Sequence, residues 1–310
     1  MEYITLPNTN VKVSKISLGC MRLKGKSVEQ IEMLLKNALE LGINYFDHAD
    51  VYGHGECESL FGEVLKRNPQ LRKKMIIQTK CDIVPVYNGG QRYDTSKEYI
   101  KKKVKESLRK LNVDYIDILL LHRPDPLCNP IELSETFSEL QEEGMVKYFG
   151  VSNHSVGKMK LLQKYLKQPL VINQMQFSII HSHMVDSDIF LNMDDSKGID
   201  RDNGMIDYCH YNEITIQTWC SLQASWMDGT FIDNPKFPKL NAVLEELANK
   251  YKVAKSAIAI AWILRHPANM IPVTGTTSID HLKQACEATN VKLTRQEWFD
   301  LYMAEDKLVP

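Results

Sequence analysis

The sequence lacks the features of several common classes of protein. Its seven cysteines are scattered and form no C-x-x-C pair, which argues against a disulfide framework and against a structural zinc site. It has no apolar run of roughly 18 residues, the length that a transmembrane helix needs, and its first residues lack the basic-then-apolar order of a signal peptide. We therefore expect a cytoplasmic protein with reduced thiols.

The chain also lacks an excess of charge of either sign. Its formal net charge is −1 over 310 residues, so no electrostatic force attracts it to nucleic acid or to an anionic membrane. A hydrophobic content of 44% and a charged content of 25% are ordinary for a globular protein. We expect a small-molecule ligand, neither a nucleic-acid nor a membrane partner, and a monomer or weak homo-oligomer.

Short apolar runs alternate with stretches of helical period along the whole chain. The runs that predict strands are 16–20, 44–49, 75–80, 115–122, 146–152, 170–176, 214–220 and 270–275. The stretches that predict helices are 27–41, 56–67, 96–111, 131–143, 155–167, 203–211, 238–250, 255–266 and 278–289, with Ser134 and Ser278 at plausible helix starts.

Eight β-then-α units favour a (β/α)8 TIM barrel over a doubly wound sheet. The absence of a linker, a repeat or a low-complexity tract in the sequence indicates a single domain, 1–310. Residues 2–6 and 11–15 flank a polar turn and predict an N-terminal β-hairpin, which we expect to cap the bottom of the barrel. The long connections 81–96 and 177–202 fall at the C-terminal face, where barrels build their active sites.

Unusual polar and aromatic side chains collect at the ends of the predicted strands. They are Asp47, Lys80, His122, Ser152, Asn153, Gln174 and Trp219. A single polar residue at a strand end is most often an ordinary loop residue, but this many at one face of a barrel indicate a site.

The sequence offers little support for a catalytic metal site or for a glycine-rich phosphate-binding loop. His48 and Asp50 flank one alanine, and His181 and His183 flank one serine inside a polar loop. Neither pair has the further ligand that a catalytic zinc site needs. The sequence also has no G-x-x-x-x-G-K-[ST] loop and no G-x-G-x-x-G after a strand. We expect no metal.

The stretch FDHADVYGHGECE at 46–58 contains the densest group of polar residues. His48 alternates with Asp47 along the strand and should face the helix layer or the neighbouring backbone. Glu56 and Glu58 fall in the first turn of the next helix, where carboxylates are favourable. Tyr52, on the loop between strand and helix, is the remaining candidate for chemistry.

Taken in order, several motifs resemble the aldo-keto reductase superfamily over essentially the whole chain. They are FDHADVYG, Glu58, Gly62, QTK ending at Lys80, LLLHRPDP with His122, FGVSN with Ser152 and Asn153, NQ with Gln174, and IPVTG. The segment WCSL at 219–222 and the C-terminal ending are most similar to the bacterial YdhF-like branch.

The resemblance implies an NAD(P)H-dependent oxidoreductase that reduces an aldehyde or ketone, with Tyr52, Asp47, Lys80 and His122 as its catalytic residues. It also implies a cofactor that lies extended across the barrel mouth without a Rossmann domain. The residues expected to hold the cofactor are Gly19, Met21, Asp47, Ser152, Asn153, Gln174, Trp219, Ser221, Leu222, Thr274, Gly275, Thr276, Ser278, Lys283 and Gln284. The family also includes channel-associated subunits, so a nucleotide-sensing accessory protein with little turnover is the alternative.

Carbonyl reduction needs a proton donor for the oxygen while the cofactor carries the hydride. Tyrosine has an ordinary pKa of about 10, and a lysine ammonium near 4 Å would favour the phenolate by roughly 4 kcal/mol. We therefore expect Lys80 to lower the pKa of Tyr52. Asp47 should keep Lys80 charged and fixed, and His122 should orient the substrate oxygen.

The chain departs from the family pattern where the nucleotide phosphate is expected. Ser278 stands where many relatives carry a lysine or arginine, and Gln284 and Ala285 replace the usual pair that holds adenine. Hydroxyl groups and a helix N-terminus still bind phosphate. We expect NADP (NADPH) as the cofactor, with NAD possible.

The physiological substrate is not readable from the sequence. Apolar and aromatic residues on predicted loops indicate an apolar aldehyde or ketone. They are Met21, Tyr87, Tyr93, Phe177, Trp226 and Phe231.

Overall fold

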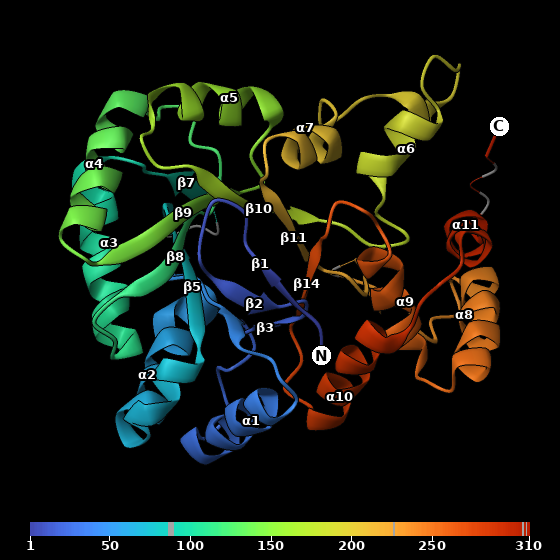
Figure 1. Ribbon diagram of the computed structural model, residues 1–310, viewed down its shortest axis with the longest axis horizontal. Coiled ribbons are helices and arrows are strands. Elements are labelled where there is room, and N and C mark those ends of the chain that lie inside the picture. Colours follow the sequence, from blue (N-terminus) through green and yellow to red (C-terminus); the bar gives the residue numbers. More distant parts are fainter. Residues whose placement is uncertain (86–89, 226, 306, 308) are drawn as a thin grey trace.

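Runs rich in isoleucine, leucine and valine form strands that are buried on both faces, as in parallel sheets generally. The computed structural model describes residues 1–310 except 86–89, 226, 306 and 308. Eight parallel strands close into a barrel (Figure 1). They are β3 (Ser17–Gly19), β4 (Tyr45–Asp47), β5 (Ile76–Cys81), β8 (Ile116–Leu121), β9 (Val146–Ser152), β10 (Leu170–Gln176), β11 (Thr215–Trp219) and β14 (Ile271–Thr274). All eight predicted strands are present, and the predicted TIM barrel is confirmed.

Helices surround the barrel and bury their apolar faces against it (Figure 1). They are α1 (Val28–Glu40), α2 (Glu56–Arg67), α3 (Lys97–Leu111), α4 (Pro130–Glu142), α5 (Val156–Tyr165), α7 (Met205–Tyr211), α8 (Pro238–Tyr251), α9 (Lys255–Leu264) and α10 (Ile279–Glu287). In α1 the buried residues are Ile31, Leu34, Leu35 and Ala38, the spacing of one helical face.

Helix starts follow the expected capping chemistry at Ser278 and depart from it at Ser134. The Ser278 hydroxyl caps α10 by accepting from the His281 N–H. Helix α4 begins earlier than expected, because the Asn129 side chain caps its first turn. Ser134 therefore lies inside α4, and its hydroxyl donates to the Tyr165 carbonyl at 2.8 Å.

The predicted N-terminal hairpin closes the bottom of the barrel. Strands β1 (Tyr3–Thr5) and β2 (Lys12–Ser14) pair antiparallel. Leu6, Val11 and Val13 are buried in one cluster with barrel residues such as Ile118. The hairpin therefore leaves the C-terminal ends of the strands as the open face.

The long connections at that face carry structure that the sequence patterns did not predict. The first contains a hairpin of β6 (Ile83–Pro85) and β7 (Gln91–Tyr93), and the second contains α6 (His183–Ile189). A third hairpin, β12 (Gln223–Ser225) and β13 (Gly229–Thr230), follows β11.

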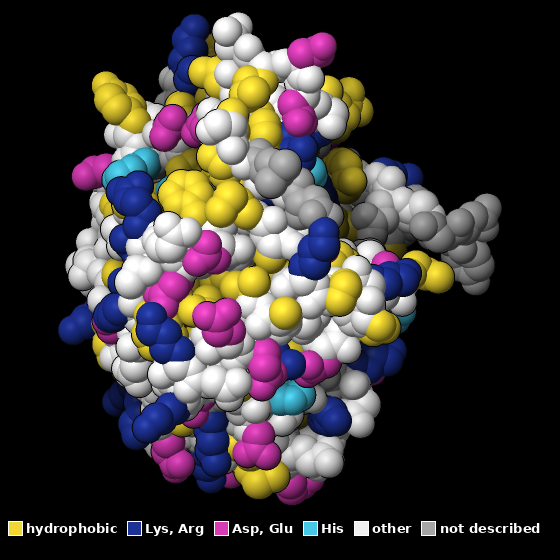
Figure 2. All heavy atoms as spheres, turned by 90° about the vertical axis from the view of Figure 1, so that its right-hand side faces the viewer, with side chains coloured by type: hydrophobic (Ala, Val, Ile, Leu, Met, Phe, Trp, Pro, Cys, Tyr) yellow, Lys and Arg dark blue, Asp and Glu magenta, His cyan; other side chains and the backbone are white. Residues whose placement is uncertain are grey.

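The chain continues past the predicted elements into α11 (Arg295–Met303), which lies beside α8 (Figure 1). None of the helices in the described part of the chain is long and apolar enough to cross a membrane. Figure 2 shows the side with α6, α8 and α11, where hydrophobic side chains gather in the upper part among charged ones.

Candidate active site

Tyr52 is placed by a sharp turn between β4 and α2. It begins a short 3-10 helix, η1 (Tyr52–Gly55), in which Gly53, His54 and Gly55 have φ values of 59°, 59° and 85°. Glycine adopts this left-handed region without strain, so the two glycines allow the chain to reverse at once into α2. The phenol of Tyr52 then stays over the end of β4.

Lys80 contacts both Asp47, at the end of β4, and Tyr52, on the turn that follows it. Its ammonium Nζ donates to both carboxylate oxygens of Asp47, at 2.7 and 2.8 Å, and to the His48 carbonyl at 2.8 Å. It also lies 3.0 Å from the Tyr52 hydroxyl. Lys80 is completely buried and Asp47 nearly so, so both charges are shielded from solvent.

The charge of Lys80 depends on its partners. Burial alone lowers the pKa of a lysine, but the Asp47 carboxylate and the Tyr52 phenol more than offset it, and the pKa of Lys80 is raised. Lys80 is therefore an ammonium at neutral pH.

Lys80 lowers the pKa of Tyr52, as expected, but not enough to bring it below the ordinary value of a tyrosine. Burial of the phenol raises the pKa of Tyr52 above its ordinary value, more than Lys80 lowers it, and Asp47 raises it further. Burial disfavours the phenolate because a charged form loses its hydration. Tyr52 is therefore a neutral phenol at neutral pH, which is the state of a proton donor.

His122 follows β8, and its ring meets that of Tyr52 edge-on, with centroids 6.0 Å apart. Burial, and then the charges of Lys80 and Arg123, hold the pKa of His122 well below its usual value. Its Nδ1 is buried without a hydrogen-bond partner. Its Nε2 is not among the buried unpaired atoms of the described residues, so a neutral imidazole can present Nε2 to a ligand at the mouth.

Four of the predicted cofactor residues lie together beside this group. The Ser152 hydroxyl and the Asn153 backbone N–H both donate to the Gln174 carbonyl at 3.0 Å. The Asn153 amide donates to the Ser152 hydroxyl at 2.8 Å. The Trp219 indole N–H donates to Asn153 Oδ1 at 3.1 Å, which fixes the plane of the indole ring.

The Gln174 side chain faces the interior of the barrel. Its Nε2 donates to Asp47 Oδ1 at 3.0 Å and to Gln217 Oε1 at 2.6 Å. Gln78 makes the same two contacts from β5, at 2.5 and 2.8 Å. Gln78 and Gln217 were missed by the sequence analysis, although a polar residue inside an apolar strand, as in IIQTK or ITIQTW, was the available sign.

Four predicted cofactor residues lie between the end of β14 and the start of α10, namely Thr274, Gly275, Thr276 and Ser278. The Thr276 hydroxyl accepts from the Ser278 backbone N–H at 3.0 Å. Thr274 is half-buried, and a Cβ added to Gly275 would have no neighbour within 4 Å. This segment therefore combines hydroxyl groups, open space and a helix N-terminus.

The two predicted residues on α10 are differently placed. Lys283 Nζ is 3.9 Å from Asp280 Oδ1, and its side chain is 55% exposed, so its ammonium can move. Gln284 Oε1 accepts from the Ser256 hydroxyl at 3.0 Å, which ties it to α9.

The other predicted cofactor residues follow β3 and β11. Met21 is exposed, whereas Gly19 is buried where a Cβ would lie 2.8 Å from Val273 Cγ1. Ser221 is buried and its hydroxyl donates to the Thr218 carbonyl at 3.2 Å, and Leu222 is half-buried. Met21 is therefore the most solvent-exposed of these side chains.

Glu58 and His48, two other polar residues of the stretch 46–58, are completely buried. Glu58 is buried in the helix layer, where it accepts from the hydroxyls of Thr79, at 2.7 Å, and Ser107, at 3.1 Å. His48 faces the same layer, as expected, with its ring 4.5 Å from that of Phe61.

Two candidates for an apolar substrate pocket are wrong. Phe177 and Phe231 are buried in the hydrophobic core, and Phe177 stacks on Trp262 with ring centroids 5.3 Å apart. Both aromatic rings fill space between elements and do not line an open mouth. Tyr87 and Trp226, also predicted, lie outside the described residues.

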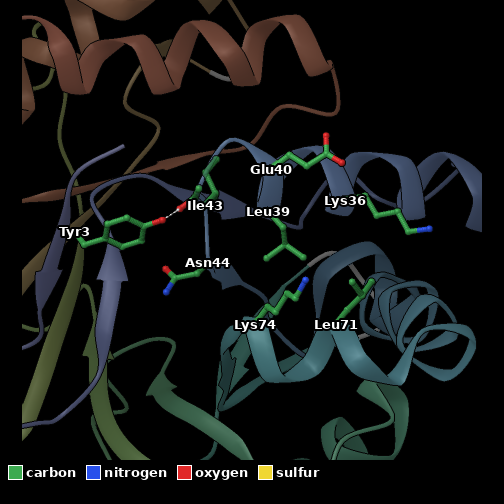
Figure 3. Close-up of a pocket in the computed structure, with 9 residues that line it drawn as sticks. Tyr3, Lys36, Leu39, Glu40, Ile43, Asn44, Leu71 and Lys74 are labelled. Carbon is green, nitrogen blue, oxygen red and sulfur yellow. Dashed lines mark hydrogen bonds between the residues drawn. The ribbon is translucent and has the colours of Figure 1, made fainter.

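A pocket of about 430 Å3 lies at the other end of the molecule (Figure 3). Tyr3 of the hairpin, Leu39 near the end of α1, Asn44 before β4, and Leu71 and Lys74 of a 3-10 helix line it. These elements precede the strands, so the pocket is remote from the strand ends that carry Tyr52 and Lys80.

Known proteins resemble this chain in sequence over nearly its whole length. A family model described as "Aldo/keto reductase family" matches residues 15–304. Oxidoreductase YdhF of Escherichia coli (strain K12) is 32% identical over 98% of this chain and 97% of its own. A 6-dehydroglucose reductase of Agrobacterium fabrum is also 32% identical, over 97% of each chain.

Solved structures share the fold. A thermostable aldo-keto reductase in complex with the inhibitor epalrestat has a TM-score of 0.77 and 24% identity, covering 98% of this chain and 100% of its own. A glycerol dehydrogenase from Gluconobacter oxydans has a TM-score of 0.78 and 22% identity, covering 97% and 94%. The family model and the sequence identities mean that the chain belongs to the aldo/keto reductase family, whose members are oxidoreductases that use nicotinamide cofactors.

Proposed function

We propose that this protein reduces an aldehyde or ketone to an alcohol and that Tyr52 donates the proton to the carbonyl oxygen. The observation that carries the proposal is the position of Lys80 Nζ, in contact with both oxygens of Asp47 and 3.0 Å from the Tyr52 hydroxyl. A neutral phenol beside a fixed ammonium can give up a proton, because the ammonium stabilises the phenolate that remains.

The other two residues act on charge and orientation. Asp47 keeps Lys80 in its charged form and fixes its ammonium. The neutral imidazole of His122 presents Nε2 to the substrate oxygen and stabilises the charge that develops there. Each group therefore acts on the same carbonyl oxygen, either directly or through Tyr52.

The residues at the mouth fit a nicotinamide ring. Both Nε2 contacts of Gln174 are made inside the barrel, whereas its Oε1 has no hydrogen bond and is not among the buried unpaired atoms of the described residues. Gln174 is therefore left with an acceptor for the N–H groups of a carboxamide. The Trp219 ring, fixed by Asn153, offers a flat face for stacking. A bound reduced nicotinamide would supply the hydride to the carbonyl carbon.

For the nucleotide phosphates we propose the segment from Thr274 to Ser278 and the N-terminus of α10, with Lys283 as the mobile cation. Hydroxyl groups and free backbone N–H groups at a helix start bind phosphate. We propose NADPH as the preferred cofactor, because Lys283 is only loosely paired at 3.9 Å and can turn toward a 2′-phosphate. Measurement of kcat/KM with NADPH and NADH checks this preference.

The decisive experiment compares the wild type with Tyr52→Phe in an assay of NADPH consumption with a panel of aldehydes, ketones and quinones. We expect kcat to fall at least about a hundredfold, because general-acid catalysis is lost. The dissociation constant of NADPH, measured by fluorescence quenching, should stay within about threefold, because Tyr52 does not hold the cofactor.

Tyr148→Phe is the matched control. Its hydroxyl donates to Asn10 Oδ1 at 2.8 Å, on the hairpin at the closed end of the barrel, so activity should be unchanged. Full activity in Tyr52→Phe would overturn the assignment of Tyr52. Cofactor binding without turnover by the wild type would favour the nucleotide-sensing alternative.

A further inference from the structure

Three glutamines project into the barrel directly beneath the candidate active site. Gln78 on β5, Gln174 on β10 and Gln217 on β11 are at most 3% exposed. A buried amide is costly unless its donors and acceptors are satisfied. The partners of these side chains therefore decide what they do.

Asp47 fixes the orientation of two of the amides. An ionised carboxylate only accepts hydrogen bonds, so the nitrogens of Gln78 and Gln174, at 2.5 and 3.0 Å from its Oδ1, must face it. The same two nitrogens lie 2.8 and 2.6 Å from Gln217 Oε1. The Gln217 amide nitrogen then faces the other way and donates to the Ser17 hydroxyl at 3.2 Å.

Tyr45 completes the network from β4. Its hydroxyl donates to Gln78 Oε1, and burial, followed by the charge of Asp47, raises the pKa of Tyr45 well above its ordinary value. Tyr45 is therefore a neutral donor, and both the amide nitrogen and the oxygen of Gln78 have partners. A buried side chain whose polar atoms all have partners is held in one arrangement.

We infer that Gln78, held by Tyr45 and Gln217, is a positioning residue for the pair formed by Asp47 and Lys80. Gln78 fixes Oδ1 of Asp47, the carboxylate fixes the ammonium of Lys80, and the ammonium lies 3.0 Å from the proton donor Tyr52. The inference rests on the proposed function, because it assigns Gln78 a part in that chemistry.

The position of Gln78 distinguishes this role from ordinary packing. Its partner on the neighbouring strand β8 is the apolar Ile118, which is buried in a hydrophobic cluster of barrel residues, and an aliphatic residue in place of Gln78 would fill the same layer without any desolvation cost. Its amide N–H groups go to Asp47 and to Gln217. The cost of burying this amide is thus offset by contacts at the site.

The test replaces Gln78 by methionine, which keeps the length and removes the amide. We expect kcat for carbonyl reduction to fall about tenfold to a hundredfold, because small misplacements of catalytic groups have effects of this size. The KM values for the carbonyl substrate and the cofactor should stay within about threefold, since Gln78 reaches neither of them. This separation of kcat from KM is not expected of general destabilisation.

Gln168→Met is the matched control. Gln168 is also buried, and its amide donates to the Ser138 hydroxyl at 3.3 Å and to Gln141 Oε1 at 3.1 Å, between α4 and the start of β10. We expect its kcat to stay within about twofold of the wild type, because it loses the same kind of group at a place that does not touch Asp47.

A double variant keeps the inference testable if Gln78→Met does not fold. The double variant with Tyr45→Phe and Gln78→Met replaces both partners by apolar groups and leaves no unpaired Tyr45 hydroxyl, and it should show the same loss of kcat. Where Gln78→Met does fold, adding it to Tyr52→Phe should lower kcat by less than about threefold further, because both changes act on one proton transfer.

The outcomes separate the two proposals. A wild type without turnover overturns both. A wild type that turns over, with a folded Gln78→Met variant whose kcat stays within about twofold, overturns only the role of Gln78. Equal losses of kcat in Gln78→Met and Gln168→Met, or independent losses in the Tyr52→Phe background, would also overturn it.

Discussion

Asp47, the last residue of β4, and His48, which follows it, have opposite environments because side chains alternate along an extended chain. Asp47 faces the barrel interior, where it meets Lys80, Gln78 and Gln174. The next residue, His48, faces the helix layer, and neither of its ring nitrogens has a hydrogen-bond partner among the described residues. Burial, and then the charge of Lys80, lowers the pKa of His48 to about 3.

His48 should make the protein sensitive to acid. Its pKa is depressed on folding, so its contribution to stability is present above the ordinary pKa of about 6.5 and is lost as the pH falls toward 3. Between pH 7 and 5 the loss amounts to about 2 kcal/mol, because the unfolded chain binds a proton there and the folded one does not.

We expect His48→Met to remove this loss, so that urea unfolding at pH 7 and pH 5 gives more similar stabilities than in the wild type. His210→Met is the control, because His210 is exposed on α7 and the variant should keep the acid dependence of the wild type. An unchanged difference between the two pH values in His48→Met would contradict the prediction.

At the scale of elements, α2 and α3 approach each other closely where a glycine faces a backbone. A Cβ added to Gly62 in α2 would lie 1.9 Å from the Lys110 carbonyl oxygen and 2.9 Å from the Leu111 carbonyl carbon. The backbone of α3 cannot move aside as a flexible side chain would. Gly62 therefore sets the distance between the two helices that follow β4 and β5, the strands of Asp47 and Lys80.

Gly62→Ala should destabilise the protein by at least about 2 kcal/mol, because overpacking outweighs the gain of up to about 1 kcal/mol in helix propensity. Gly157→Ala in α5 is the control: its added Cβ has no neighbour within 4 Å, so it should be neutral or stabilising. Urea unfolding of both variants checks the signs, and a stable Gly62→Ala protein would disprove the close approach.

At the scale of the molecule, aromatic rings connect the C-terminal helix to the loops at the barrel mouth. Phe177 stacks on Trp262, Trp262 on Trp298 at 4.8 Å, and Trp298 on Tyr302 at 5.7 Å. Tyr302 then donates to Asp186 Oδ1 in α6 at 2.8 Å. The column thus holds α11 against the long connection between β10 and α7.

That residues 1–310 act as a single domain stays a prediction.

Tyr302→Phe should loosen α6 while leaving the aromatic column in place. The variant loses one hydrogen bond to a buried carboxylate, which costs roughly 1–3 kcal/mol. We expect faster hydrogen exchange in peptides that cover α6, measured by mass spectrometry. Tyr165→Phe, at a tyrosine that is 39% exposed at the end of α5, is the control; equal exchange in α6 for both variants would rule out the connection.

The order of the elements follows from local patterns that the sequence carries by itself. Runs such as IDILLL predict buried strands, and the spacing of Ile31, Leu34, Leu35 and Ala38 predicts a helical face. The hairpin of β6 and β7, the hairpin of β12 and β13, and helix α6 were not predicted, because short elements have too few residues for a clear period.

The candidate site was predicted in part. Motif resemblance indicated Asp47, Tyr52, Lys80 and His122, and the structure brings all four to one end of the barrel; their roles stay predictions. The contacts of Gln78 were not predicted, because pairs that meet across a barrel depend on strand register, which no local pattern contains.

The sequence by itself thus determined the eight β/α units and the polar residues at their strand ends. Only the tertiary structure decided that burial raises the pKa of Tyr52 and that Gln78 donates to Asp47. The physical reason is that local periodicity depends on neighbours in the chain, whereas desolvation and hydrogen bonds across the barrel depend on neighbours in space.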